Sequence, residues 1–122
     1  MENFKPTIWV SSSKKDLRKF PKKVKETFGE AIMYAQCGEK HPKAKIYKHQ
    51  GSGGILEVVE DDTAGTFRTL YTVKFEKAVI ILHAFQKKSK KGIETTKQDK
   101  DLISSRMQLA KQIYEEWLEH EK

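Results

Sequence analysis

Four lysines stand just beyond an apolar segment in the second half of the chain. Residues 78–82 read AVIIL, His83 and Phe85 follow, and residues 87–91 contain the lysines Lys87, Lys88, Lys90 and Lys91. A buried strand that ends in this way holds several cations on a rigid support, where they can bind a phosphate and stabilise charge that develops on it. Phe85 adds an aromatic surface on which an RNA base can stack. A solvated charge run is the alternative explanation of the lysines.

Arg68 is a second cationic candidate, and it lies in the preceding strand-like segment, residues 67–73 (FRTLYTV). Strand alternation places Arg68 on the opposite side from Phe67 and Tyr71. The planar guanidinium has a fixed fork of donors that suits phosphate. An ion pair with an acid of the same sheet, such as Glu57, is the alternative reason for an arginine at this position.

Histidines supply the remaining candidates for proton transfer. His83 can exchange a proton near neutral pH, and alternation groups it with Ile81 and Phe85; a hydrogen-bonded core histidine is the alternative. His41 and His49 lack a carboxylate or cysteine at ligand spacing, so we expect no metal site. We also find no motif for a nucleotide or other cofactor.

Composition and charge limit the classes of protein to which this chain can belong. A chain of 122 residues is expected to form one domain, residues 1–122. Its net charge of +7 favours an acidic partner such as nucleic acid, and residues 14–25 carry seven Lys or Arg against the single acid Asp16. The one cysteine, Cys37, excludes an internal disulfide and makes the cytoplasm the expected compartment. The longest apolar run is too short to cross a membrane.

The elements that position these residues follow from periodicity. Apolar residues at helical spacing predict a short helix ending near Phe20, a longer helix over residues 21–36 that stops at Gly38, and a final helix from Lys97. Alternation predicts strands over residues 6–10, 54–60, 66–75 and 77–85, with residues 45–48 as a further short candidate in a polar loop. We therefore expect an α+β fold in which the helices cover one face of the sheet and leave the other for a ligand.

Two motifs carry a resemblance to a known family. The segment FRTLY (67–71), followed by LHAFQKK (82–88), resembles the RelE/ParE toxin superfamily of bacterial toxin–antitoxin pairs, and its phage-derived, HigB-like branch in particular. The resemblance covers essentially the whole chain, although only about twenty residues are diagnostic. It implies a RelE-like antiparallel four-stranded sheet with two N-terminal helices and a C-terminal helix.

The resemblance also implies an activity and partners. It implies a type II toxin that cuts mRNA on the ribosome through attack of a 2′-hydroxyl on the neighbouring phosphate, without a metal, and a helix-turn-helix antitoxin that masks it. Arg68 matches the phosphate-binding arginine, and Lys87 and Lys88 match the basic pair. The expected RNA contacts are Tyr71, Phe85, Lys90, Lys48 and His49.

One departure from the family pattern concerns the proton acceptor. Some members carry catalytic lysines where this chain has Glu57 and Val59, so a base must come from His83, Lys87 or Lys91. Part of the superfamily inhibits DNA gyrase instead of cutting RNA. A non-catalytic binder of the same fold, either gyrase-inhibiting or an inactive phage-derived nucleic-acid-binding protein, is therefore the alternative function.

Overall fold

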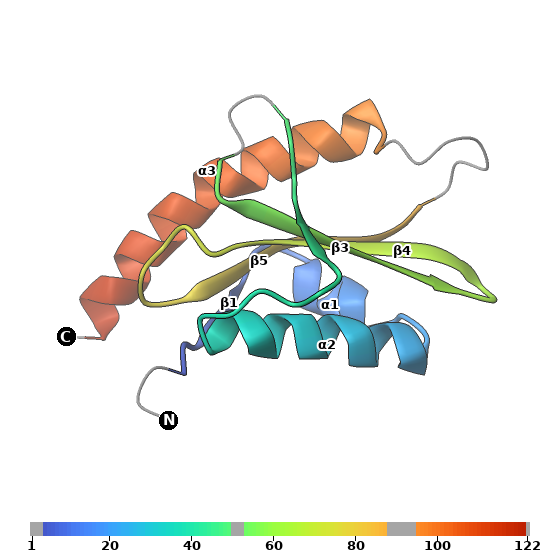
Figure 1. The fold of residues 1–122 in the computed structure, drawn as a ribbon. Helices are drawn as coiled ribbons and strands as arrows, with labels where there is room; N and C mark the ends of the chain where they lie inside the picture. The colour runs from blue at the N-terminus through green and yellow to red at the C-terminus, as the bar shows by residue number, and fades with distance from the viewer. Residues whose placement is uncertain (1–3, 50–52, 88–94, 122) are drawn as a thin grey trace.

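The chain folds into three layers around a mixed β-sheet (Figure 1). The computed structural model describes residues 4–49, 53–87 and 95–121. Helices α1 (Ser13–Arg18) and α2 (Lys22–Gln36) lie against one face of the sheet, and α3 (Lys97–His120) crosses the other. The α+β class and the three helices agree with the sequence-based expectation. Among the described residues, no helix combines the length and apolar character that a membrane span requires.

The sheet has five strands in the order β1-β5-β4-β3-β2. Its centre is the predicted antiparallel meander of β3 (Ile55–Asp62), β4 (Gly65–Thr72) and β5 (Val79–Lys87). At one edge β1 (Thr7–Trp9) pairs with β5 in parallel, and at the other edge β2 (Ala44–Ile46) pairs with β3.

The expected antiparallel four-stranded sheet is thus corrected to a mixed five-stranded one. The fifth strand, β2, is three residues long, and Ala44 is the only residue of it that is buried. Such a short strand in a polar segment leaves almost no alternation to detect.

Helices cover both faces of the sheet, which corrects the expectation that one face stays open. Val24, Phe28 and Ala31 of α2 pack with Val58 on one side. On the other side, residues of α3 that include Ile103 and Ala110 pack in a second cluster with strand residues such as Leu70 and Ile80. A ligand must therefore bind at the ends or edges of the sheet.

A β-bulge in β5 changes the direction of His83. Leu70 pairs with His83 but the next residue, Tyr71, pairs with Ile81, so Leu82 is an extra residue in the strand. Two consecutive residues of a bulge share one side of the sheet. Leu82 and His83 therefore both face α3, whereas Ile81 faces α1 and α2. The predicted grouping of His83 with Ile81 is wrong for this reason.

Candidate functional site

Arg68 and Glu57 form an ion pair on the α3 side of the sheet. The Nη1 of Arg68 donates to Oε2 of Glu57 at 2.7 Å and to Oγ1 of Thr95 at 3.1 Å. The two charged side chains are only 8% and 16% exposed. The ion pair that the sequence left as an alternative is therefore present, and the guanidinium is held in one orientation.

Tyr47 brings a phenol to the same region. Burial raises the pKa of Tyr47, and the negative charges of Glu57 and Asp99 raise it further. The Tyr47 ring lies 6.2 Å from that of His49, centroid to centroid. Lys48 and His49 are themselves exposed in the segment after β2.

Phe85 and Lys87 share the face of Arg68. Arg68 pairs with Phe85 across β4 and β5, and Lys87 lies two residues further along the same strand. Phe85 is half-buried and stacks on the His83 ring, with centroids 4.5 Å apart and planes at 20°. The structure thus brings Arg68, His83 and Phe85 together, with Lys87 at the end of the strand. Lys88, Lys90 and Lys91 lie outside the described residues.

His83 is held by two partners from α3. Its Nε2 lies 2.9 Å from Oδ1 of Asp99, and its Nδ1 lies 3.4 Å from Nη1 of Arg106. A carboxylate only accepts and a guanidinium only donates, so a neutral ring with its proton on Nε2 satisfies both contacts. Burial lowers the pKa of His83; the hydrogen bond to Asp99 opposes this shift and the Arg106 charge adds to it.

Arg106 links three elements beneath the site. It donates to the carbonyl oxygen of Leu82 at 2.9 Å and to Oγ of Ser12 at 3.2 Å. Ser12 in turn donates to Oδ2 of Asp16 at 2.7 Å, instead of accepting from a free amide at the start of α1. Burial lowers the pKa of Arg106, and the charge of Asp16 acts against that shift.

Arg106 and Asp99 were not identified from the sequence, although the position of each in its local sequence pattern is informative. Arg106 stands three residues after Ile103 and four before Ala110, which places a charge on the buried stripe of α3. Asp99 is the third residue after Thr96, in the spacing of a capping box. A charge within an apolar stripe indicates a buried polar partner, which here is the carbonyl of Leu82.

Tyr71 belongs to the core and not to the site. Its side chain is fully buried with the cluster under α1 and α2, on the opposite side of the sheet from Arg68. Burial raises its pKa to about 12. The expectation that Tyr71 contacts RNA is therefore wrong in this fold.

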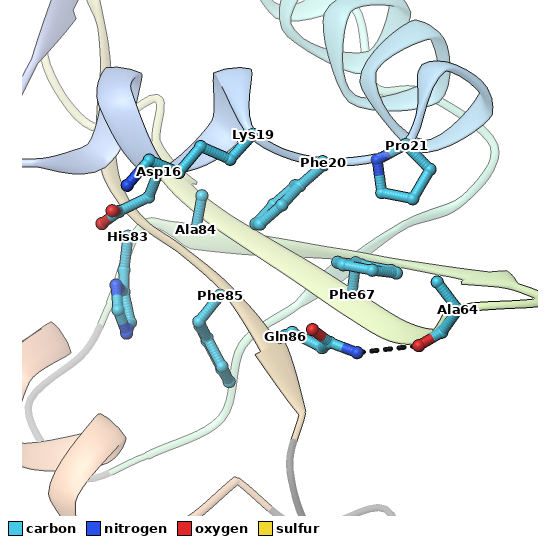
Figure 2. A pocket seen from close by; sticks show the side chains of 10 residues that line it. All are labelled: Asp16, Lys19, Phe20, Pro21, Ala64, Phe67, His83, Ala84, Phe85 and Gln86. Carbon is cyan, nitrogen blue, oxygen red and sulfur yellow. Dashed lines mark hydrogen bonds between the residues drawn. The ribbon is translucent and has the colours of Figure 1, made fainter.

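A groove of about 590 Å³ runs along the outer edge of β5, as Figure 2 shows. Its walls come from the α1–α2 connection, the β3–β4 turn and the strand itself. His83 and Phe85 border it, so it adjoins the Arg68 face. Among the described residues, no group of three or more His, Cys, Asp or Glu is placed to hold a metal ion.

Comparison with known proteins places the chain in a family. Residues 15–108 match the family described as phage-derived protein Gp49-like (DUF891), which is well over half of the sequence. The chain therefore belongs to the Gp49-like family, and its predicted assignment to a phage-derived branch is confirmed. No curated protein matches the sequence.

A solved structure also resembles this one. The crystal structure of the isolated E. coli RelE toxin, P21 form, superposes with a TM-score of 0.48 at 14% sequence identity. The match covers 83% of this chain and 97% of that chain.

Proposed function

We propose that the protein is the toxin of a type II toxin–antitoxin pair and cuts mRNA on the ribosome. The observation that carries this proposal is the Arg68–Glu57 pair beside Phe85, on three adjacent strands that hold these residues in register. Membership in a phage-derived family supports the same class. The proposed reaction is attack of a 2′-hydroxyl on the adjacent phosphate to give a 2′,3′-cyclic phosphate, with departure of the 5′-oxygen of the next nucleotide, which takes a proton from water.

Arg68 and Glu57 have complementary roles in that reaction. Arg68 donates hydrogen bonds to the phosphate, and its charge stabilises the extra negative charge of the transition state. Glu57 accepts the proton of the attacking 2′-hydroxyl, because it is the carboxylate next to Arg68. Phe85 offers its ring for stacking of a base. Lys87 adds positive charge at the strand end.

His83 serves this site as a positioning residue in our proposal. The lone pair on Nδ1 faces Arg106 and the proton on Nε2 is directed to Asp99, so neither nitrogen is available to a substrate. Its ring instead supports Phe85 from beneath. We therefore propose Glu57 as the general base, in place of His83, Lys87 or Lys91.

Cell-free translation with mapping of mRNA ends tests the assignment. Glu57→Gln keeps a hydrogen-bond acceptor for Arg68 but removes the proton acceptor, so cleavage should fall about 100-fold or more. Arg68→Lys should also reduce cleavage, because it loses the fork of donors. Arg68→Ala is less suitable, since it leaves a largely buried carboxylate without its partner, at a cost of about 3–5 kcal/mol.

The control for the loss of a carboxylate is Glu26→Gln, which changes an exposed residue of α2. Urea unfolding of each variant separates lost chemistry from lost folding. Cleavage by Glu57→Gln at the parent rate would show that Glu57 is not the base. Translation arrest with intact mRNA would rule out the endonuclease.

A non-catalytic binder of the same fold is the second candidate, and one observation favours it. The charge of Arg68 is already neutralised by Glu57 at 2.7 Å, so a phosphate must compete with that carboxylate. Such a protein would inhibit DNA gyrase or only dock nucleic acid. Inhibited supercoiling with intact mRNA would identify the former, and RNA binding without toxicity would identify an inactive phage-derived protein.

The proposed partners are the ribosome with its mRNA and a helix-turn-helix antitoxin. A net charge of +7 suits both, because ribosomal RNA and an acidic antitoxin surface are each negative. The cytoplasm is the proposed compartment, since both partners act there.

A further inference from the structure

The groove beside β5 lies at a strand edge that is paired with β1 over only part of its length. β1 pairs with β5 only at residues 79–81, so the described strand pairing on this side ends before His83. Beyond that point α1 and the α1–α2 connection stand next to the strand, and the groove opens between them (Figure 2). Its volume of about 590 Å³ is within the range of small-ligand sites.

Gln86 is a positioned polar group in this groove. Its Nε2 donates to the carbonyl oxygen of Ala64 at 2.8 Å, which orients the amide and leaves Oε1 as an acceptor. Gly65 makes this contact possible, because a Cβ there would lie 2.7 Å from Nε2. Gly65 also has φ +137°, a conformation that other residues rarely adopt. The turn is thus built around the amide of Gln86.

Aromatic side chains border the groove from both sides of β5, with Phe20 on the α1–α2 side and Phe85 on the α3 side (Figure 2). Figure 2 shows Phe20 projecting from the α1–α2 connection toward the strands. Its ring centroid lies 4.9 Å from that of Phe67, and it is half-buried, so part of its surface faces the groove. Phe85 borders the groove as well, and it is the strand partner of Arg68. A base against Phe20 would therefore be separated from the proposed reaction centre by the edge of β5.

The α1–α2 segment beside the groove is rich in exposed cations, and one of them lines the groove. All seven basic residues of the α1–α2 segment are exposed, and no ion pair joins any of them to a described residue; they are Lys14, Lys15, Arg18, Lys19, Lys22, Lys23 and Lys25. Lys19 lines the groove itself. The one acid of the segment, Asp16, lines the groove as well, and it accepts a hydrogen bond from Ser12. Unpaired cations beside an aromatic surface are the combination that single-stranded nucleic acid requires.

We propose that this groove binds one unpaired nucleotide of RNA that flanks the linkage held by Arg68. The base lies against Phe20, its phosphate contacts Lys19, and Oε1 of Gln86 accepts a hydrogen bond from the edge of the base. Adenine, cytosine and guanine offer an exocyclic amine to this acceptor, whereas the single imide N–H of uracil stands between two carbonyl oxygens. The site therefore disfavours uracil. This inference rests on the proposed action on RNA.

Binding of fluorescent hexanucleotides to the full-length protein tests the inference. With Gln86→Met, binding of the adenine and cytosine hexamers should weaken about threefold to tenfold, the effect of one lost hydrogen bond. Binding of the uracil hexamer should change less. With Lys19→Glu, all hexamers should bind more weakly, and the salt dependence should become shallower.

The matched controls are Gln112→Met and Lys111→Glu, which make the same chemical changes on exposed residues of α3. If the groove variants bind every hexamer like their controls, or the parent binds none, the groove is not an RNA site. If they weaken only the antitoxin complex, the groove is a protein-docking site and the proposal is wrong. Cleavage of mRNA by the parent in cell-free translation decides the proposed function separately.

Discussion

Arg68 has one observed contact with an acid of its own sheet and, in the proposed function, a second contact with a phosphate of the RNA. In the register of β3 and β4, Arg68 stands opposite Val59, and Glu57 is its diagonal neighbour. A long side chain reaches a diagonal partner on the same face of a sheet. Alternation in the sequence was sufficient to name Glu57 as a candidate partner. Alternation could not decide whether Arg68 binds a carboxylate of the protein or a phosphate of a ligand, because either partner would approach Arg68 on the same face of the sheet.

His83 should make stability depend on pH in a defined window. Its pKa is lowered in the folded state, so below its ordinary value of 6.5 the unfolded chain binds the proton first. The free energy of unfolding should therefore fall as the pH is lowered through 6.5, until the pKa of the folded state is reached. One proton gives a slope of at most about 1.4 kcal/mol per pH unit. Urea unfolding at a series of pH values measures it.

Variants of two histidines test whether His83 causes this dependence of stability on pH. His83→Gln retains an N–H donor for Asp99 and cannot titrate, so its stability should depend less on pH between about 7 and 5. His120→Gln, at the exposed end of α3, controls for the removal of an imidazole as such. Equal slopes for the parent and His83→Gln would contradict the assignment.

Helices and the central strands were predictable because each carries a repeated pattern. Five buried residues of α2 recur at three- and four-residue steps between Val24 and Ala35, and Gly38 ends the helix with φ +81°. The bulge at Leu82 was not predictable, since inserting one residue leaves an apolar strand still apolar. The coverage of both sheet faces was missed for a related reason. A strand buried on both sides does not alternate in polarity, and Val79, Ile80 and Ile81 are all fully buried.

The start of α3 should be stabilised by one hydroxyl. The Oγ1 of Thr96 accepts from the backbone N–H of Asp99 at 3.2 Å and donates to Oδ2 of Asp99 at 2.8 Å. Thr96→Ala should lower the free energy of unfolding by about 1 kcal/mol, the usual cost of a lost N-cap. Thr96→Ser keeps the hydroxyl and should retain most of that stability. A urea midpoint for Thr96→Ala equal to that of the parent would show that the cap is not formed.

The proposed reaction centre and much of the exposed positive charge lie on opposite sides of the sheet. The ion pair of Arg68 lies on the α3 side of the sheet, whereas the seven exposed cations of the α1–α2 segment lie on the other side. The sequence located both groups of cations but could not place them relative to the sheet, because that depends on which face each helix covers. The groove at the edge of β5 connects the two sides, and it was not expected from the sequence.

An antitoxin that masks the proposed site should protect lysines at one end of the molecule. The negative surface of such a partner would cover the β5 end, so acetylation of Lys87 and Lys88 should be slower in the purified complex than in the free protein. Lys111 and Lys77 lie elsewhere on the surface and should react equally in both samples. Mass spectrometry of peptides from both samples measures the difference. If residues 87–91 react at the same rate with and without the partner, the antitoxin inhibits from another surface.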